Sequence, residues 1–235
     1  MTQDRFFSIV ASRPEAGRDA AYNDWYNEHV TILFGYPGMS RASRYALYEP
    51  VGDTGQMSPA YVTMYEYKTR EDMGGVAASD AFAIGGKQFE EGWPGTGIMD
   101  WSGAYEPVEV LSRLSDVKTE TGPGKGRWLD VVASGPKPGH EAAYNDWYHE
   151  HITHLFRYDG LVHVSRNRCS KRIAETEVHS PDYLTVYEFG SQAAADAFYT
   201  LPMMKKAAEH WMAHGQAITD VAFAGLYRPL ITLER

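Results

Sequence analysis

Two histidines are the side chains of this sequence best suited to acid–base chemistry. His29 follows Trp25 by four positions, and His151 follows Trp147 by four positions in a nearly identical stretch. At about 100° per residue, each histidine shares one broad helical face with the aromatic residues, so we expect both imidazoles to point towards a β-sheet. Partial burial favours the neutral imidazole, which can serve as a general base at ordinary pH. A histidine on such a face can equally be a packing residue that bonds a backbone carbonyl or a tyrosine.

The second half of the chain holds eight of the nine histidines. His151 and His154 are three residues apart and therefore neighbours on one helical face, which we expect to face the sheet. We predict His151 as the principal acid/base, supported by His154 and Asp146, with His29 as the equivalent group of the first half. Chance acquisition of exposed histidines is a fair explanation for His140, His149 and His179.

Alternating tyrosines form a second set of chemically active side chains. Tyr183 and Tyr187 fall on one face of a predicted strand, and Tyr65 occupies the same position as Tyr187 in the first half. We predict Tyr187 as a proton donor to the substrate, although cross-strand aromatic packing also explains such a row. The predicted substrate-binding residues are Trp147, Tyr144, Tyr183, Arg166, Trp25 and Tyr65.

Arginines retained in both halves have two readings. Arg44 and Arg166 occupy equivalent positions of a predicted strand. Each could hold an anionic group of a ligand or form a structural ion pair, Arg44 with Glu66 and Arg166 with Glu188. The ion pair is the simpler reading.

The sequence segments that contain these residues occur twice in the chain. The heptapeptide AAYNDWY occurs at residues 20–26 and again at 142–148, an offset of 122. The same offset joins Val10-Ala11-Ser12 to Val132-Ala133-Ser134 and Tyr105 to Tyr227. An offset that recurs in separated blocks predicts a tandem duplication.

Each copy shows the order β-α-β-β-α-β, typical of a ferredoxin-like unit. The fold class predicted is therefore α+β, with two ferredoxin-like repeats at 1–111 and 127–235 and a polar, Gly/Pro-containing linker at 112–126. The expected strands are 6–11, 39–48, 61–67 and 98–110, then 128–133, 161–173, 183–189 and 218–233. The expected helices are 16–34 and 77–90, then 140–156 and 192–214.

The two helical motifs carry a family resemblance. Asp24-Trp25-Tyr26-Asn27-Glu28-His29 and Asp146-Trp147-Tyr148-His149-Glu150-His151, with Gly38 and Gly160 after them, resemble the dimeric α+β barrel superfamily in a fused, single-chain form. The resemblance implies a closed barrel with helices outside, and a substrate between the first helix and the sheet. The superfamily includes polyketide cyclases, cofactor-free monooxygenases, lactone isomerases and haem enzymes such as chlorite dismutases, so the fold does not select one function.

Composition excludes some partners. The formal net charge is −9 and basic residues are scattered, which argues against nucleic acid and anionic membrane as partners. No segment is an apolar signal core or a membrane span, and Cys169 is the only cysteine, so we expect a cytoplasmic protein. Further dimerisation of the fused chain stays open.

The function predicted is a cofactor-independent enzyme of lyase, isomerase or cyclase type, as in aromatic-compound catabolism. It would act on an aromatic or hydrophobic carbonyl compound by histidine acid–base chemistry. The alternatives are a cofactor-free oxygenase, a haem- or metal-dependent enzyme, and a non-catalytic ligand-binding protein. No metal and no cofactor are predicted, because His149 and His151 lie about 200° apart on a helix and cannot share one ion.

Overall fold

Eight long strands form a closed antiparallel barrel. The computed structural model describes residues 5–52, 57–114, 120–176 and 178–235, so residues 115–119 of the expected linker lie outside the described part. The strand order is β2-β3-β1-β4-β7-β8-β6-β9, and β9 pairs back with β2 to close the ring. A two-residue strand, β5 (Gly122–Pro123), adds to β9. The predicted barrel is therefore confirmed.

The elements follow the predicted order. Residues 6–112 form β1 (Phe6–Pro14), α1 (Asp19–Leu33), β2 (Met39–Pro50), β3 (Tyr61–Tyr67), α2 (Arg70–Gly75), the short helix η1 (Val76–Ala78), α3 (Asp80–Gly92) and β4 (Gly97–Ser112). Residues 128–234 form β6 (Trp128–Pro136), α4 (Glu141–Leu155), β7 (Leu161–Glu175), β8 (Tyr183–Phe189), α5 (Gln192–Phe198), α6 (Pro202–His210), the wide turn η3 (Trp211–Gly215) and β9 (Thr219–Glu234).

The second helical region of each half is divided where the sequence expectation had one helix. Ser79 accepts a hydrogen bond from the backbone N–H of Phe82 and begins α3, which separates it from α2 and η1. Pro202 lies in the first turn of α6, where its fixed φ suits the start of a helix. Because proline has no backbone N–H to donate, α5 cannot continue through this position. Local capping chemistry therefore overrides the longer apolar pattern.

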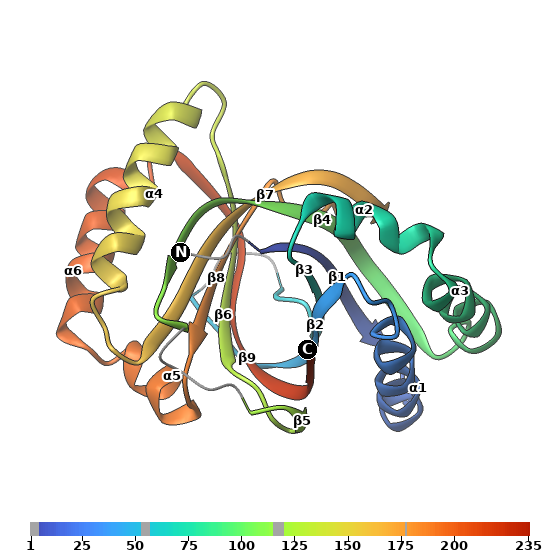
Figure 1. Ribbon diagram of the computed structural model, residues 1–235. Helices are drawn as coiled ribbons and strands as arrows, with labels where there is room; N and C mark the ends of the chain where they lie inside the picture. The colour runs from blue at the N-terminus through green and yellow to red at the C-terminus, as the bar shows by residue number, and fades with distance from the viewer. Residues whose placement is uncertain (1–4, 53–56, 115–119, 177) are drawn as a thin grey trace.

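The barrel wall separates three apolar layers. One cluster fills the barrel interior and includes Ile9, Val62, Leu129 and Val186. Two outer clusters lie where α1 with α3, and α4 with α6, cover opposite sides of the barrel (Figure 1). Alternate strand residues face the two layers, as the two-residue repeat of a strand requires. Within the described residues, no helix is long and apolar enough to cross a membrane.

A buried ionic network lies inside the barrel. Arg5 donates to Glu66 at 2.6 Å and to Glu188 at 2.5 Å, which joins the two halves. Arg41 lies 3.3 Å from Glu66 and Arg127 lies 2.6 Å from Glu188. The predicted pairs Arg44–Glu66 and Arg166–Glu188 are therefore wrong.

The alternation of strand residues explains that correction. Arg44 pairs in register with Thr63, on the helix-facing side of the barrel wall, whereas Glu66 points to the interior. Arg166 stands opposite Thr185 in the same way. A charge on one face of a sheet cannot reach a charge on the other face.

Candidate functional site

The face that the first helix of each half presents to the sheet is aromatic and contains no histidine. Tyr144, Tyr148 and Ile152 of α4 are buried against the barrel. His151 is one position from Ile152, about 100° around the helix, and is only half buried. The expectation that His29 and His151 face the sheet is therefore wrong: each faces the second helix of its half.

His151 is packed between aromatic rings. Its imidazole stacks on the indole of Trp147, with ring centroids 4.7 Å apart and planes 23° apart. The imidazole of His210, from α6, lies nearly parallel at 6.3 Å. Burial, and the nearby His210 and His154, lower the pKa of His151 to about 4, so the ring is neutral at neutral pH. His151 makes no side-chain hydrogen bond to any residue that the structure describes, which leaves its ring nitrogens available.

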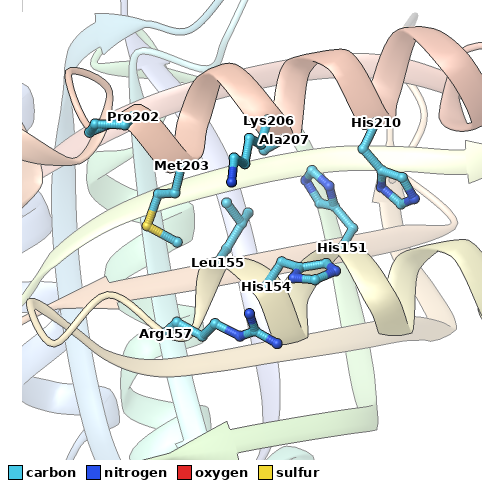
Figure 2. A pocket seen from close by; sticks show the side chains of 9 residues that line it. All are labelled: His151, His154, Leu155, Arg157, Pro202, Met203, Lys206, Ala207 and His210. Atoms are coloured by element: carbon cyan, nitrogen blue, oxygen red, sulfur yellow. The ribbon is translucent and has the colours of Figure 1, made fainter.

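A groove of about 430 Å³ runs between α4 and α6 beside His151. Figure 2 shows His151, His154 and His210 at one end, with Arg157 and Lys206 reaching in from facing sides. His154 is exposed and lies along this groove instead of facing the sheet as expected, because α6 rather than the barrel stands opposite it. The groove is lined by His151, His154, Leu155, Arg157, Pro202, Met203, Lys206, Ala207 and His210.

The equivalent histidine of the first half has a hydrogen-bond partner. His29 stacks on Trp25 at 4.6 Å, but its Nδ1 is hydrogen-bonded to Gln88 Oε1 at 2.8 Å. Phe89 and Trp93 pack on the same indole at 6.1 and 5.0 Å. Burial lowers the pKa of His29 as well, while the bond to Gln88 opposes that shift. The two halves therefore hold the same stacked pair, and the described residues give a hydrogen-bond partner to His29 but none to His151.

The strand tyrosines face the helices, as predicted, but lie away from His151. Tyr187 is 3% exposed and packs on Phe198 at 6.4 Å, and burial raises its pKa well above the ordinary value. Tyr65 is buried likewise and its pKa is raised for the same reason. No described contact joins Tyr187, the predicted proton donor, to His151, the predicted acid/base.

Arg166 is enclosed by tyrosines. Its guanidinium lies 4.7, 4.8 and 5.0 Å from the ring centroids of Tyr144, Tyr148 and Tyr183, and it donates to Asn145 Oδ1 at 2.5 Å. The residue is 1% exposed. Such cation–π packing between α4 and the barrel wall gives Arg166, Tyr144 and Tyr183 a positioning role for α4.

The sequence did not identify Asp130, a buried acid, as a candidate site residue. Asp130 of β6 accepts a hydrogen bond from Tyr199 at 2.5 Å, and its other carboxylate oxygen has no partner among the described residues. Burial raises the pKa of Asp130 to about 7. A single aspartate in an alternating strand gives no signal by itself. Asp146, by contrast, is exposed on α4 and does not line the groove.

The histidines of the groove do not converge on one point. Within the described residues, no group of three histidine, cysteine or acidic side chains is arranged to hold a metal ion. His210 Nε2 instead lies 3.7 Å from the carboxylate of Glu150. The arrangement offers one neutral imidazole for proton transfer, with other imidazoles and two cations around it.

Solved structures share this fold at low sequence identity. An anthrone oxidase-like protein covers 99% of this chain and 93% of its own length, with a TM-score of 0.63 and 13% identity. A monooxygenase candidate from Fusobacterium nucleatum covers 100% and 99%, with a TM-score of 0.62 and 10% identity. A chlorite dismutase candidate covers 97% and 95%, with a TM-score of 0.56 and 12% identity. No family model and no curated sequence matches the chain.

These structures and the closed eight-stranded barrel define the class of fold. The chain has the fold of a dimeric α+β barrel, with all eight strands of the barrel supplied by one polypeptide. The identities are too low to carry more than the fold, so function has to be argued from the site.

Proposed function

We propose that the protein is a small-molecule enzyme whose reaction begins with proton removal by His151. The substrate would be an aromatic or hydrophobic carbonyl compound bound in the α4–α6 groove. A ring nitrogen of His151 takes the proton from the carbon next to the carbonyl, and the electron pair moves onto the carbonyl oxygen to give an enolate. Return of the proton to another atom, or loss of a leaving group, gives isomerase or lyase chemistry without a cofactor.

The observation that carries this proposal is the unbonded, neutral imidazole of His151 at an open groove. Its stack on Trp147 fixes the ring plane, and its nitrogens are not used by another described side chain. A base must be unprotonated and within reach of the substrate before it can act. His29 meets the first condition, but its Nδ1 is held by Gln88.

A cofactor-free oxygenase is the second function that the same site supports. An enolate or phenolate formed by His151 is electron-rich, and molecular oxygen can accept its electrons. The neighbours with oxidase and monooxygenase names make this variant worth testing alongside the first. Both reactions share the proton-removal step, so both depend on His151.

Haem enzymes also occur in this superfamily, and the groove residues can be tested against that group. Imidazoles are present as possible iron ligands. A porphyrin, however, needs apolar contact over both of its wide faces, while the groove offers only the aliphatic patch of Leu155, Met203 and Ala207. His154, Arg157 and Lys206 leave the rest polar and exposed. These residues do not fit a buried haem.

Solvent-deuterium exchange tests the proposed function directly. The purified protein is incubated in D₂O with a panel of aromatic and alicyclic ketones and phenols, and deuterium incorporation is followed by proton NMR. We expect incorporation into at least one ring-bearing ketone well above the buffer rate. A visible spectrum with a Soret band and stoichiometric iron in the same preparation would overturn the cofactor-free assignment.

We further propose that the two halves are tandem copies of one ferredoxin-like unit, 1–111 and 127–235, joined by 112–126. The constant sequence offset supports this, as does the same order of elements in both halves. The stacked pairs Trp25–His29 and Trp147–His151 also agree in geometry. Duplication followed by divergence explains why His29 has a hydrogen-bond partner while His151 has none among the described residues.

A further inference from the structure

We propose that the α4–α6 groove selects anionic aromatic molecules, carboxylates or phenolates, and that Arg157 and Lys206 bind the negative group. The proposal deepens the proposed function by naming its substrate class, and it rests on that function for the fate of the bound molecule. Its binding part stands on the lining of the groove alone.

The two cations of the groove have no acidic partner in the part of the chain that the structure describes. Arg157 follows the end of α4 and Lys206 projects from α6, so they approach the groove from facing sides (Figure 2). Neither side chain makes a hydrogen bond or an ion pair with any residue that the structure describes. Two cations without a described acidic partner therefore lie at one groove of a chain whose net charge is −9. Together they make a local attraction for an anion.

The rest of the lining fits the body of an aromatic ligand. Leu155, Met203 and Ala207 form an apolar patch along the groove, with Met203 towards the end away from the histidines. Methionine adapts to a flat ring, and its sulfur makes favourable contacts with aromatic edges. A ligand with an apolar ring and one negative group would therefore contact the patch and the cations together. A neutral apolar molecule would leave both cations unused.

The first half carries a neutral residue, Gln88, at the position equivalent to Lys206. Gln88 occupies the position four residues before Gly92, as Lys206 stands four residues before His210. In the first half Gln88 closes on His29 at 2.8 Å. In the second half the longer, positively charged side chain of Lys206 takes this position, and His151 has no described hydrogen-bond partner. Lys206 in place of a neutral amide therefore leaves His151 without this partner and adds a positive charge to the groove.

A bound anion also changes the base. Burial and the imidazoles of His210 and His154 favour the neutral form of His151, whereas a negative group close to the ring favours the protonated form. Binding of an anionic substrate would therefore strengthen His151 as a proton acceptor at the moment when it is needed. The same cations can stabilise the negative charge that develops on the enolate oxygen.

Two probes of equal shape and different charge test the selection. The dissociation constants of 2-naphthoate and 2-naphthamide are measured by ligand-detected NMR against the full-length protein at low and high salt. We expect naphthoate to bind about tenfold more tightly than naphthamide, with a preference that shrinks as salt is raised. In the Arg157→Gln/Lys206→Gln double variant, naphthoate should bind no better than naphthamide.

Lys205→Gln is the matched control. Lys205 is exposed on the same helix and does not line the groove. Its replacement removes one positive charge next to Lys206, where the double variant removes two. We expect it to leave the naphthoate preference within twofold of wild type. Because Arg157 and Lys206 are exposed, their replacement should leave the circular dichroism spectrum unchanged.

The outcomes separate this inference from the proposed function. Equal binding of the two probes, binding of neither, or an unchanged preference in the double variant would each overturn anion selection. Selective naphthoate binding that Lys205→Gln keeps and the double variant loses supports it. Selective binding without any deuterium exchange would remove the enzyme proposal and leave the anion site in place.

Discussion

The imidazole of His151 stacks on the indole of Trp147 at 4.7 Å, and His29 repeats the relationship on Trp25 at 4.6 Å. The four-residue spacing places each pair on the same helical flank, facing the second helix of its half. The two histidines differ in what faces them from the second helix of each half. Gln88 bonds His29, whereas His151 faces a groove and has no described side-chain partner. One packing motif thus supports two different environments.

The pH profile of exchange should report His151. Its pKa of about 4 means that kcat/KM for a neutral ketone should stay flat as pH falls from neutrality and then drop near pH 4. The sign follows because the protonated ring cannot accept a proton. The measurement is the initial rate of deuterium incorporation across the pH range, with circular dichroism to confirm that the protein stays folded. An acid limb near the ordinary histidine value would contradict a desolvated base.

Close packing at η3 holds Trp147 in place. A Cβ at Gly215 would lie 2.6 Å from an atom of Trp147 and 2.6 Å from an atom of Trp211. We expect Gly215→Ala to lower the free energy of unfolding by about 1–3 kcal/mol and to disturb the His151 stack. Gly86→Ala on α3 is the control, because its Cβ would meet open space and should be neutral or mildly stabilising. Chemical denaturation of both variants decides, and equal effects would contradict the packing account.

Arg166 should matter for stability rather than for ligand binding. Arg166→Lys keeps the charge but loses the planar group that lies among three tyrosine rings, so we expect a loss of about 1–3 kcal/mol. Arg168→Lys, exposed on the same strand, should change stability by less than about 0.5 kcal/mol. Unfolding in urea and naphthoate titration are measured on both variants. If Arg166→Lys keeps full stability and loses naphthoate binding, the positioning role is wrong.

Asp130 should make the fold less stable as pH rises. Its pKa is about 7 in the folded protein and 3.8 as the ordinary value, so the folded state holds the proton more tightly. The contribution is fully present below the ordinary value and is lost as pH rises to about 7. Asp130→Asn removes this dependence, so its stability relative to wild type should rise over that window, by on the order of 4 kcal/mol. Asp146→Asn is the exposed control, expected to shift nothing; a parallel pH dependence of wild type and Asp130→Asn would refute the assignment.

Much of the scaffold could be predicted because strands and helices leave regular patterns. The alternation at Tyr61–Tyr67 and Tyr183–Phe189 gave both strand boundaries to the residue. The helical motif predicted that His151 and Trp147 share a face, but not which neighbour that face meets. Whether the barrel or α6 lies opposite depends on tertiary packing, and an angular step of about 100° between neighbouring residues is enough to reverse the conclusion.

The missing parts of the site came from long-range contacts. Arg157 and Lys206 are ordinary surface cations in the sequence, and only the approach of α4 to α6 brings them to one groove. Arg166 was expected to bind a charge, yet the tyrosines that enclose it come from α4 and from β8. Asp130 gained its raised pKa from burial that a single strand position does not reveal.

The most direct test of the central claim compares His151→Gln with His29→Gln in the deuterium-exchange assay on the same ketone. Glutamine keeps hydrogen-bonding capacity and bulk but cannot accept the proton. The account predicts that His151→Gln lowers the exchange rate by about a hundredfold or more, the usual share of a general base, while His29→Gln stays within about threefold of wild type. Equal rates in the two variants, or full activity in His151→Gln, would contradict it.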